Sequence, residues 1–224
     1  MAARLGKDVK TVGDAWRLWS AKRSPRILAA GLVLAVVLRL VLGDLTWRDA
    51  VAAAAMLLVY PFGEWAIHVY LLHLPPVRWR GREVELPTAA SHRMHHEAPH
   101  DLGMIVFAPV EALALLLGAV PAVVGLGCLA VGLVAGPVPV GAAVTAGAVA
   151  YALILAYEWT HFLIHTAHRP SSRYYRAIWR GHRLHHFKNE RYWHGITHTL
   201  SDRVLGTHPD QRSVERSPTA RTLR

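Results

Sequence analysis

Long apolar stretches alternate with basic, histidine-bearing segments along the chain. The first two stretches cover residues 27–42 and 49–73, and residues 104–165 are apolar almost throughout. A helix needs about 20 apolar residues to cross the ~30 Å hydrocarbon core of a bilayer. Gly and Pro break the last stretch at 136–139. The pattern therefore predicts an all-α, polytopic membrane protein with about four transmembrane helices.

Pro61 and Pro121 each interrupt one of the predicted apolar stretches. Pro61 should kink the second span, because proline removes a helical hydrogen bond. Pro121 leaves alternatives open for 104–165: two spans, the first of them long, tilted or broken, or three shorter pieces. An even number of crossings would put the basic, histidine-rich segments before and after this stretch on one side, which favours two spans.

The positive charge of the chain follows the boundaries of these spans. The 224 residues are 53% hydrophobic and 18% charged, with a net charge of +10. Of the 25 Lys and Arg residues, 23 lie in segments 1–26, 78–93 and 169–224. This distribution is typical of the positive-inside rule rather than of nucleic-acid binding. It predicts a plasma-membrane protein with both termini and the histidine-rich segments on the cytoplasmic side.

Three regions are predicted from composition. Residues 1–25 form a basic amphipathic leader that could lie on an anionic leaflet, with a disordered basic segment as the alternative. Residues 26–207 form one membrane domain that contains all the predicted spans. Residues 208–224 are rich in Arg, Ser, Pro and Thr and are expected to be a disordered tail. Four apolar residues recur at helical spacing in the leader: Val9, Val12, Trp16 and Trp19.

Ten of the 15 histidines fall into four compact groups at the ends of predicted spans. Imidazole is a good ligand for Fe, Zn, Cu and Ni, and ten ligands are too many for one ion. They fit two ions with about five nitrogens each. The groups are His68 and His73; His92, His95 and His96; His161 and His165; and His182, His185 and His186.

The spacing within the groups predicts how the imidazoles point. Positions i, i+3 and i+4 share one face of a helix. Each H-xx-HH group is therefore expected to aim all three imidazoles at one point, as is the pair His161 and His165. His68 and His73 are five residues apart and converge only if the helix unwinds or carries a π-bulge.

The order of these motifs resembles the fatty acid hydroxylase / sterol desaturase superfamily of integral-membrane di-iron oxygenases. Gly195-Ile196-Thr197 and the later stretch at 202–207 (DRVLGT) are similar to the closing segment of that family, and Tyr157-Glu158 resembles its Tyr-Asp step. The resemblance covers residues 60–207. Glu158 stands where Asp is common, and His194 and His198 stand where the family more often has apolar or small polar residues.

The resemblance implies a four-helix transmembrane unit capped by a cytoplasmic metal site. The ten histidines would be catalytic ligands of two iron ions, which zinc could replace in a recombinant sample. The implied reaction uses O₂ to hydroxylate or desaturate a C–H bond of a membrane lipid such as a fatty acyl chain, sterol or carotenoid. Electrons must come from a separate donor protein, since the sequence has no cytochrome, flavin or Fe–S motif.

Two other classes of function compete with an oxygenase. A membrane zinc hydrolase would need fewer ligands, and the H-E-xx-H motif is absent from the sequence. A metal transporter or metal-binding protein would place its ligands near the bilayer midplane, whereas these histidines gather at one predicted edge.

The remaining polar residues near the site divide into three sets. Glu64 and Glu158 are expected to accept hydrogen bonds from ligand imidazoles, and Glu111 has no assigned role. His194 and His198 are expected near the site without binding metal. The other histidines are expected to be bystanders: His100, His168 and His208.

Overall fold

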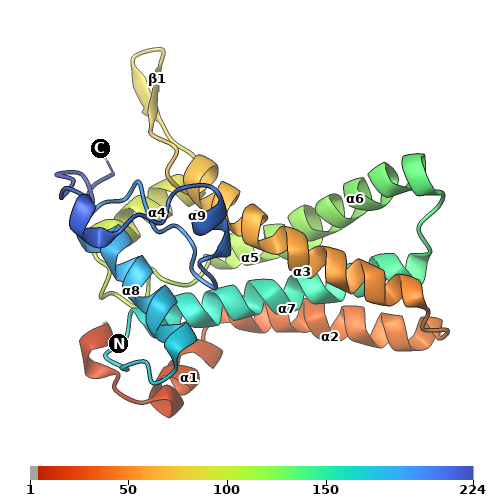
Figure 1. Ribbon diagram of the computed structural model, residues 1–224. Coiled ribbons are helices and arrows are strands. Elements are labelled where there is room, and N and C mark those ends of the chain that lie inside the picture. Colours follow the sequence, from red (N-terminus) through yellow and green to blue (C-terminus); the bar gives the residue numbers. More distant parts are fainter. Residues whose placement is uncertain (1–4, 224) are drawn as a thin grey trace. The chain divides into compact units, whose positions relative to one another are not determined.

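The computed structural model describes residues 5–223, and the described part of the chain is mostly helical (Figure 1). Short 3₁₀ turns lie at Gly6–Asp8 and Gln211–Ser213, and π-helical turns at His68–Leu72 and Leu115–Ala119. The α-helices are α1 (Val12–Ser20), α2 (Arg23–Leu42), α3 (Trp47–Ile67), α4 (Pro87–Glu97), α5 (Pro109–Ala114), α6 (Val120–Ala135), α7 (Val140–Ile164), α8 (Arg173–Phe187) and α9 (Leu200–Val204).

Within residues 5–223, four helical segments are long and apolar enough to cross a membrane, which confirms the predicted fold class. They are Arg23–Leu42, Trp47–Leu72, Pro109–Ala135 and Val140–Ile164. The third segment is continuous, but a π-helical turn ends two residues before Pro121. Proline has no N–H to donate, so a local change of hydrogen-bond pattern at this point is expected.

A small β-hairpin departs from the all-α expectation. Strand β1 (Val77–Trp79) pairs antiparallel with β2 (Arg82–Val84), with Val77 opposite Val84. The two turn residues Arg80 and Gly81 both have positive φ, 51° and 77°. Two-residue turns of this kind match the twist of a hairpin. In the sequence, Val77 and Trp79 alternate with arginine before Arg80-Gly81, whereas Val84 alone is apolar in the strand that follows.

The chain forms two compact units, which are described separately. The histidine unit contains the residues up to Arg17 together with Pro61–Val106 and Trp159–Arg224. The span unit contains Leu18–Tyr60 and Phe107–Glu158. All ten predicted ligands belong to the histidine unit.

In the span unit, α2 lies along α7 (Figure 1), and their contact is close at Gly31. A side chain at Gly31 would collide with Leu116 and touch Tyr151. The Tyr151 hydroxyl donates to the carbonyl of Leu116 at 2.7 Å, so this phenol is anchored within the apolar core.

A buried polar cluster joins three spans in the same unit. The Arg39 guanidinium pairs with Asp49 at 2.7 Å, and the Thr145 hydroxyl donates to the same carboxylate at 2.6 Å. Arg39 also donates to the carbonyls of Gly43 and Asp44. Its ion-pair partner is therefore Asp49, because the backbone carbonyl of Asp44 is what faces it.

The chain ends depart from the composition-based expectation. Part of the leader forms α1, yet Val9 and Trp19 from its predicted apolar face are buried within the protein. Val12 and Trp16 are about half exposed. In the tail, Val214 and Ala220 are buried, and the backbone between them makes defined hydrogen bonds, which are described below.

Candidate metal centre

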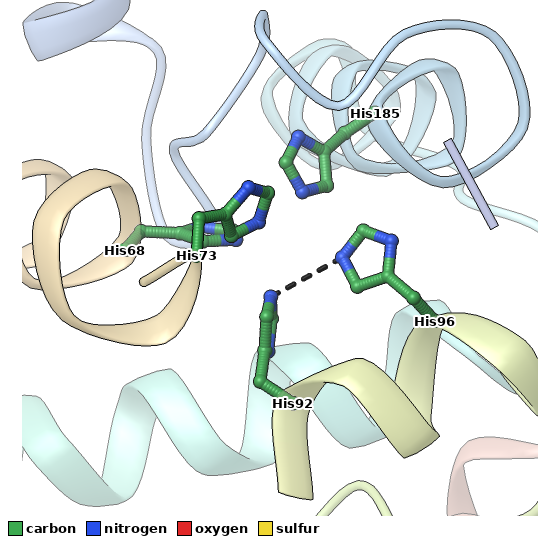
Figure 2. A group of neighbouring side chains, drawn as sticks. All are labelled: His68, His73, His92, His96 and His185. Carbon is green, nitrogen blue, oxygen red and sulfur yellow. Dashed lines mark hydrogen bonds between the residues drawn. The ribbon is translucent and has the colours of Figure 1, made fainter. Parts of the chain in front are cut away.

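The structure gathers the ten histidines into two sets of five. Within each set, one nitrogen per residue lies within 4.8 Å of the others. Figure 2 shows the first set, with imidazoles from α4, α8 and the π-helical turn after α3 converging on one point. Group 1 is His68, His73, His92, His96 and His185, and group 2 is His95, His161, His165, His182 and His186.

The expectation that each H-xx-HH motif serves one point is wrong. On α4, His92 and His96 belong to group 1 whereas His95 belongs to group 2. On an ideal helix, consecutive residues are rotated by about 100°, so His95 and His96 diverge by that angle, whereas i and i+4 diverge by only about 40°. The adjacent histidines therefore face two different sites.

Helix α8 uses the same motif in the opposite sense. His182 and His186 belong to group 2, and His185 belongs to group 1. Each of the two helices thus gives two imidazoles to one group and one to the other. This reciprocal arrangement places the two groups side by side: the His96 ring stacks on the His186 ring with centroids 4.0 Å apart.

The predicted distortion between His68 and His73 is present. Residues His68–Leu72 form a π-helical turn, and the N–H of His73 donates to the carbonyl of His68 at 3.2 Å. The extra residue in this turn brings the two rings to a centroid distance of 5.0 Å. The turn therefore compensates for the five-residue spacing.

The spacing of the facing nitrogens fits metal ions. The Nε2 atoms of His165 and His182 are 2.9 Å apart, and those of His186 and His182 are 3.0 Å apart. Two ligands at right angles on a metal with bonds of ~2.1 Å are separated by about 3 Å. In group 1, the Nε2 atoms of His92 and His96 are 3.2 Å apart.

Several ring nitrogens in the two groups have no hydrogen-bond partner among the described residues, although they are buried. Buried polar atoms of this kind call for an explanation, and a bound ion is a common one. In group 1 they are the Nε2 atoms of His68, His73 and His185, which together with the nitrogen-only donor set fit a bound transition-metal ion. In group 2 they are the outer Nδ1 atoms of His95, His182 and His186, so there the fit to a second ion rests on the spacing of the facing Nε2 atoms.

Burial keeps these imidazoles in the neutral form that binds metal. It lowers the pKa of His96 to about 4, although the Ala220 carbonyl and Glu190 act in the opposite direction. Burial also lowers the pKa of seven others outside the spans, and neighbouring histidines add to the effect: His73, His92, His95, His165, His182, His185 and His186.

Backbone carbonyls hold the outer nitrogens of group 1. The Nδ1 atoms of His68, His96 and His185 contact carbonyl oxygens at 2.6, 2.9 and 2.9 Å. The three carbonyls belong to His194, Ala220 and Tyr192. Such contacts fix the tautomer and direction of a ligand imidazole. No side-chain pattern marks a backbone acceptor, so sequence reasoning could not identify them.

Group 2 is held by a different part of the chain. His161 bonds to the carbonyl of Ile105, and His165 bonds to that of Pro99. Both acceptors lie in the loop between α4 and α5. The N-terminal segment braces this loop, since the N–H of Gly6 donates to the carbonyl of His100 at 2.8 Å.

Glu64 takes a different role from the one expected. Its carboxylate accepts from the N–H groups of Ile196 and Thr197 at 2.6 and 3.0 Å and from the Thr197 hydroxyl. It therefore anchors the loop that follows α8 instead of bonding to a ligand imidazole.

Glu158 and Glu111 also bond to non-histidine groups. Glu158 accepts from Ser24, Trp19 and the N–H of Phe107, all within the span unit. Glu111, which had no assigned role, accepts from the N–H of Ala108 at 2.8 Å and caps the start of α5.

His194 and His198 lie outside both groups of five but close to the site. The ring of His194 is 5.2 Å from that of His185, and its backbone carbonyl is the acceptor for His68. His198 lies 3.8 Å from the Glu64 carboxylate. Elsewhere, the His100 ring stacks on Phe187 and the His168 ring on Tyr175.

Residues 53–207, which include all ten histidines, match the sequence model of the family described as "Fatty acid hydroxylase". The chain belongs to the fatty acid hydroxylase family. This family of oxidoreductases combines membrane helices with histidine metal sites, as the fold and both groups do here. The superfamily resemblance is thus confirmed.

Two curated relatives resemble about two thirds of the chain. It is 31% identical over 145 residues to "Fatty acid 2-hydroxylase" of Homo sapiens, covering 64% of this chain and 36% of the relative. It is 29% identical over 146 residues to "Dihydroceramide fatty acyl 2-hydroxylase FAH2" of Arabidopsis thaliana, covering 65% and 55%. The chain thus spans between a third and a little over half of their lengths.

A solved structure shares the fold. The structure titled "Full length scs7p (only hydroxylase domain visible)" superposes with a TM-score of 0.59 at 17% sequence identity. The match covers 93% of this chain and 70% of the other.

Proposed function

We propose that the protein is an O₂-dependent hydroxylase of fatty acyl chains in membrane lipids, with two iron ions held by the ten histidines. The observation that carries the proposal is the pair of buried five-histidine groups, each with its facing nitrogens within 4.8 Å. A zinc hydrolase needs about three protein ligands. A transporter would need ligands along a path through the membrane.

The chain's own residues prepare the site for this reaction. When bound, two iron ions would supply the reduction of O₂ that oxidises a C–H bond: one oxygen atom enters the lipid and the other leaves as water, with two electrons and two protons consumed. The protein supplies neutral ligands, fixes their direction through backbone carbonyls and excludes water, since nine of the ten histidines are buried.

The substrate class rests on the relatives. Both are described as 2-hydroxylases, one of fatty acids and one of dihydroceramide fatty acyl chains. We therefore favour a fatty acyl chain over a sterol or a carotenoid, and hydroxylation over desaturation.

An exposed basic stripe on α8 is the proposed docking site for the separate electron donor. Arg173, Arg176 and Arg180 lie at i, i+3 and i+7 and are exposed. The ligands of the same helix, at 182–186, are buried. A carrier with an acidic surface would be steered to this stripe by charge. The stripe and the metal ligands would lie on the cytoplasmic side of the plasma membrane.

Lipid analysis with labelled oxygen tests the reaction. Cells expressing the protein under ¹⁸O₂ should accumulate 2-hydroxy fatty acyl lipids that carry one ¹⁸O, and an expressed His185→Ala variant should not form them. The iron-loaded protein should contain about two ions per chain. Desaturated lipid, oxidised sterol or one ion per active chain would each contradict the proposal.

Charge neutralisation tests the electron-donor site. Changing Arg173, Arg176 and Arg180 to Gln should raise the KM for an acidic carrier and weaken its salt dependence. The same change at the exposed hairpin arginines Arg78, Arg80 and Arg82 is the matched control. If the α8 variant instead loses binding to vesicles with anionic lipid and keeps its KM, the stripe contacts the membrane.

A further inference from the structure

The C-terminal segment 214–223 lies beyond the residues that match the family, yet it packs against the metal centre. Val214 and Ala220 are buried with 8% and 3% of their surface exposed. We call this segment the strap. Its composition predicts disorder, so its specific contacts need a physical reason.

One end of the strap is fastened just after α8. The N–H of Ser217 donates to the carbonyl of Lys188 at 2.8 Å. The hydroxyls of Ser217 and Thr219 both donate to one carboxylate oxygen of the buried Glu190, at 3.0 and 2.6 Å. A buried carboxylate that accepts two hydroxyl bonds is a strong anchor, because charge-assisted bonds exceed neutral ones.

The other end of the strap is fastened to the end of α4. Arg221 donates to the carbonyls of His96 and Glu97, at 2.9 and 2.5 Å. Between the two anchors, the carbonyl of Ala220 meets His96 Nδ1 at 2.9 Å in a buried contact. The proton of His96 is thereby held on Nδ1, which leaves Nε2 to face group 1.

We propose that the strap is a positioning element that sets the tautomer and direction of His96 and so supports metal binding in group 1 only. The inference rests on the proposed di-metal function. The restriction to group 1 rests on the hydrogen bonds. The strap contacts His96 of group 1, whereas His161 and His165 in group 2 bond to carbonyls at 105 and 99, outside the strap.

Metal titration of the full-length, metal-free protein in detergent tests the proposal with Co²⁺ as the probe. In the variant Ser217→Ala/Thr219→Val, both hydroxyl anchors are lost. We expect one of the two ions to bind about tenfold more weakly, the lower end of the effect of losing an outer contact of a ligand histidine. The conservative variant Ser217→Thr/Thr219→Ser keeps both hydroxyls and should bind like the wild type.

Two ligand backgrounds identify which ion responds. With His182→Ala, group 2 is impaired, so the anchor change should weaken the remaining ion. With His185→Ala, group 1 is impaired, so the same anchor change should have no effect. A general loss of structure would weaken the remaining ion in both backgrounds and would overturn the proposal.

A second variant covers the case in which the double change prevents folding. Arg221→Ala removes the two bonds that Arg221 donates to the carbonyls of His96 and Glu97, while the bond from Arg93 to the carbonyl of Leu223 remains. Arg216→Ala removes an exposed arginine of the same segment and is its control. Only Arg221→Ala should weaken one ion. If folded Arg221→Ala binds both ions normally, the proposal that the strap positions His96 is overturned. If the wild-type protein binds fewer than two ions, the proposed di-metal function is overturned, and the proposed role of the strap with it.

Discussion

The two histidine groups have the same donor chemistry but are supported by different parts of the chain. In group 1, the outer nitrogens of His68, His96 and His185 meet carbonyls at 194, 220 and 192, which follow α8. In group 2, His161 and His165 bond to carbonyls at 105 and 99, in the loop after α4. Group 1 also contains His73, the one ligand candidate that is only partly buried. The two metal positions should therefore respond separately to changes in the chain.

The largest expected effect comes from paired ligand substitutions. His92→Ala/His185→Ala removes two ligands of group 1 and should leave about one ion per chain. His92→Ala/His95→Ala removes neighbours on one helix but one ligand from each group, so it should impair both ions. Metal analysis of folded protein distinguishes the two results.

The opposite result would support the simpler interpretation, in which all three histidines of one H-xx-HH motif bind the same ion. If the pair His92 and His95 left one ion intact while the pair His92 and His185 lost both, each H-xx-HH would serve a single ion. Turnover should be lost in both variants, so activity alone cannot decide between the two arrangements.

A smaller effect is expected at Asp202, which acts on group 1 through the backbone. Its carboxylate accepts from the N–H groups of His194 and Gly195 at 3.0 and 2.7 Å. It thereby holds the His194 carbonyl against His68. Asp202→Asn should weaken one ion about tenfold, as measured by Co²⁺ titration.

The exposed Asp210 provides the control for this change, because its carboxylate caps only a local turn at Arg212. Asp210→Asn should leave both ions bound as in the wild type. Equal weakening of both ions by Asp202→Asn would show that the loop supports the whole centre and not group 1 alone.

A substitution at Gly6 tests group 2 from the other end of the chain. A Cβ at this position would collide with the backbone carbonyl of His165. Gly6→Ala should therefore push the N-terminal segment away from His165 and cost about 1–3 kcal/mol of stability through overpacking. Gly13→Ala is the control, since nothing lies within 4 Å of a Cβ there. If Gly6→Ala weakened metal binding in group 1 more than in group 2, the separate support of the two groups would be contradicted.

The spans and the ten histidines could be predicted because both leave periodic signals. Apolar runs broken by Gly and Pro predict four spans, and the spacing of His68 and His73 predicts either an unwound helix end or a π-bulge. The division of each H-xx-HH between two sites was not predicted. Positions i, i+3 and i+4 share a helix face, but the side chains of His95 and His96 still differ in direction by about 100° around the helix axis.

The supporting contacts could not be predicted for a different reason. A carbonyl oxygen is present at every residue, so nothing in the sequence distinguishes Ala220 as the partner of His96. The strap has a polar composition because its bonds use Ser217, Thr219 and Arg221, and the same composition indicates disorder when the partners are unknown.

The smallest effect is expected in the polar cluster of the span unit, which contains none of the ten histidines. Thr145→Val replaces the hydroxyl that donates to Asp49 with a methyl group of similar size. Asp49 keeps its ion pair with Arg39 and its bond from the N–H of Thr46, so the cluster loses one of several contacts. Polar contacts between membrane helices are individually weak. The melting temperature in detergent should fall by about 2–4 °C, while Thr145→Ser should melt like the wild type.

Both variants should bind two ions with unchanged affinity, because all ten histidines and their outer bonds lie in the histidine unit. A loss of either ion in Thr145→Val would show that the spans also set the geometry of the metal centre. The carbonyl contacts of the two groups would then be only part of the structure that supports metal binding.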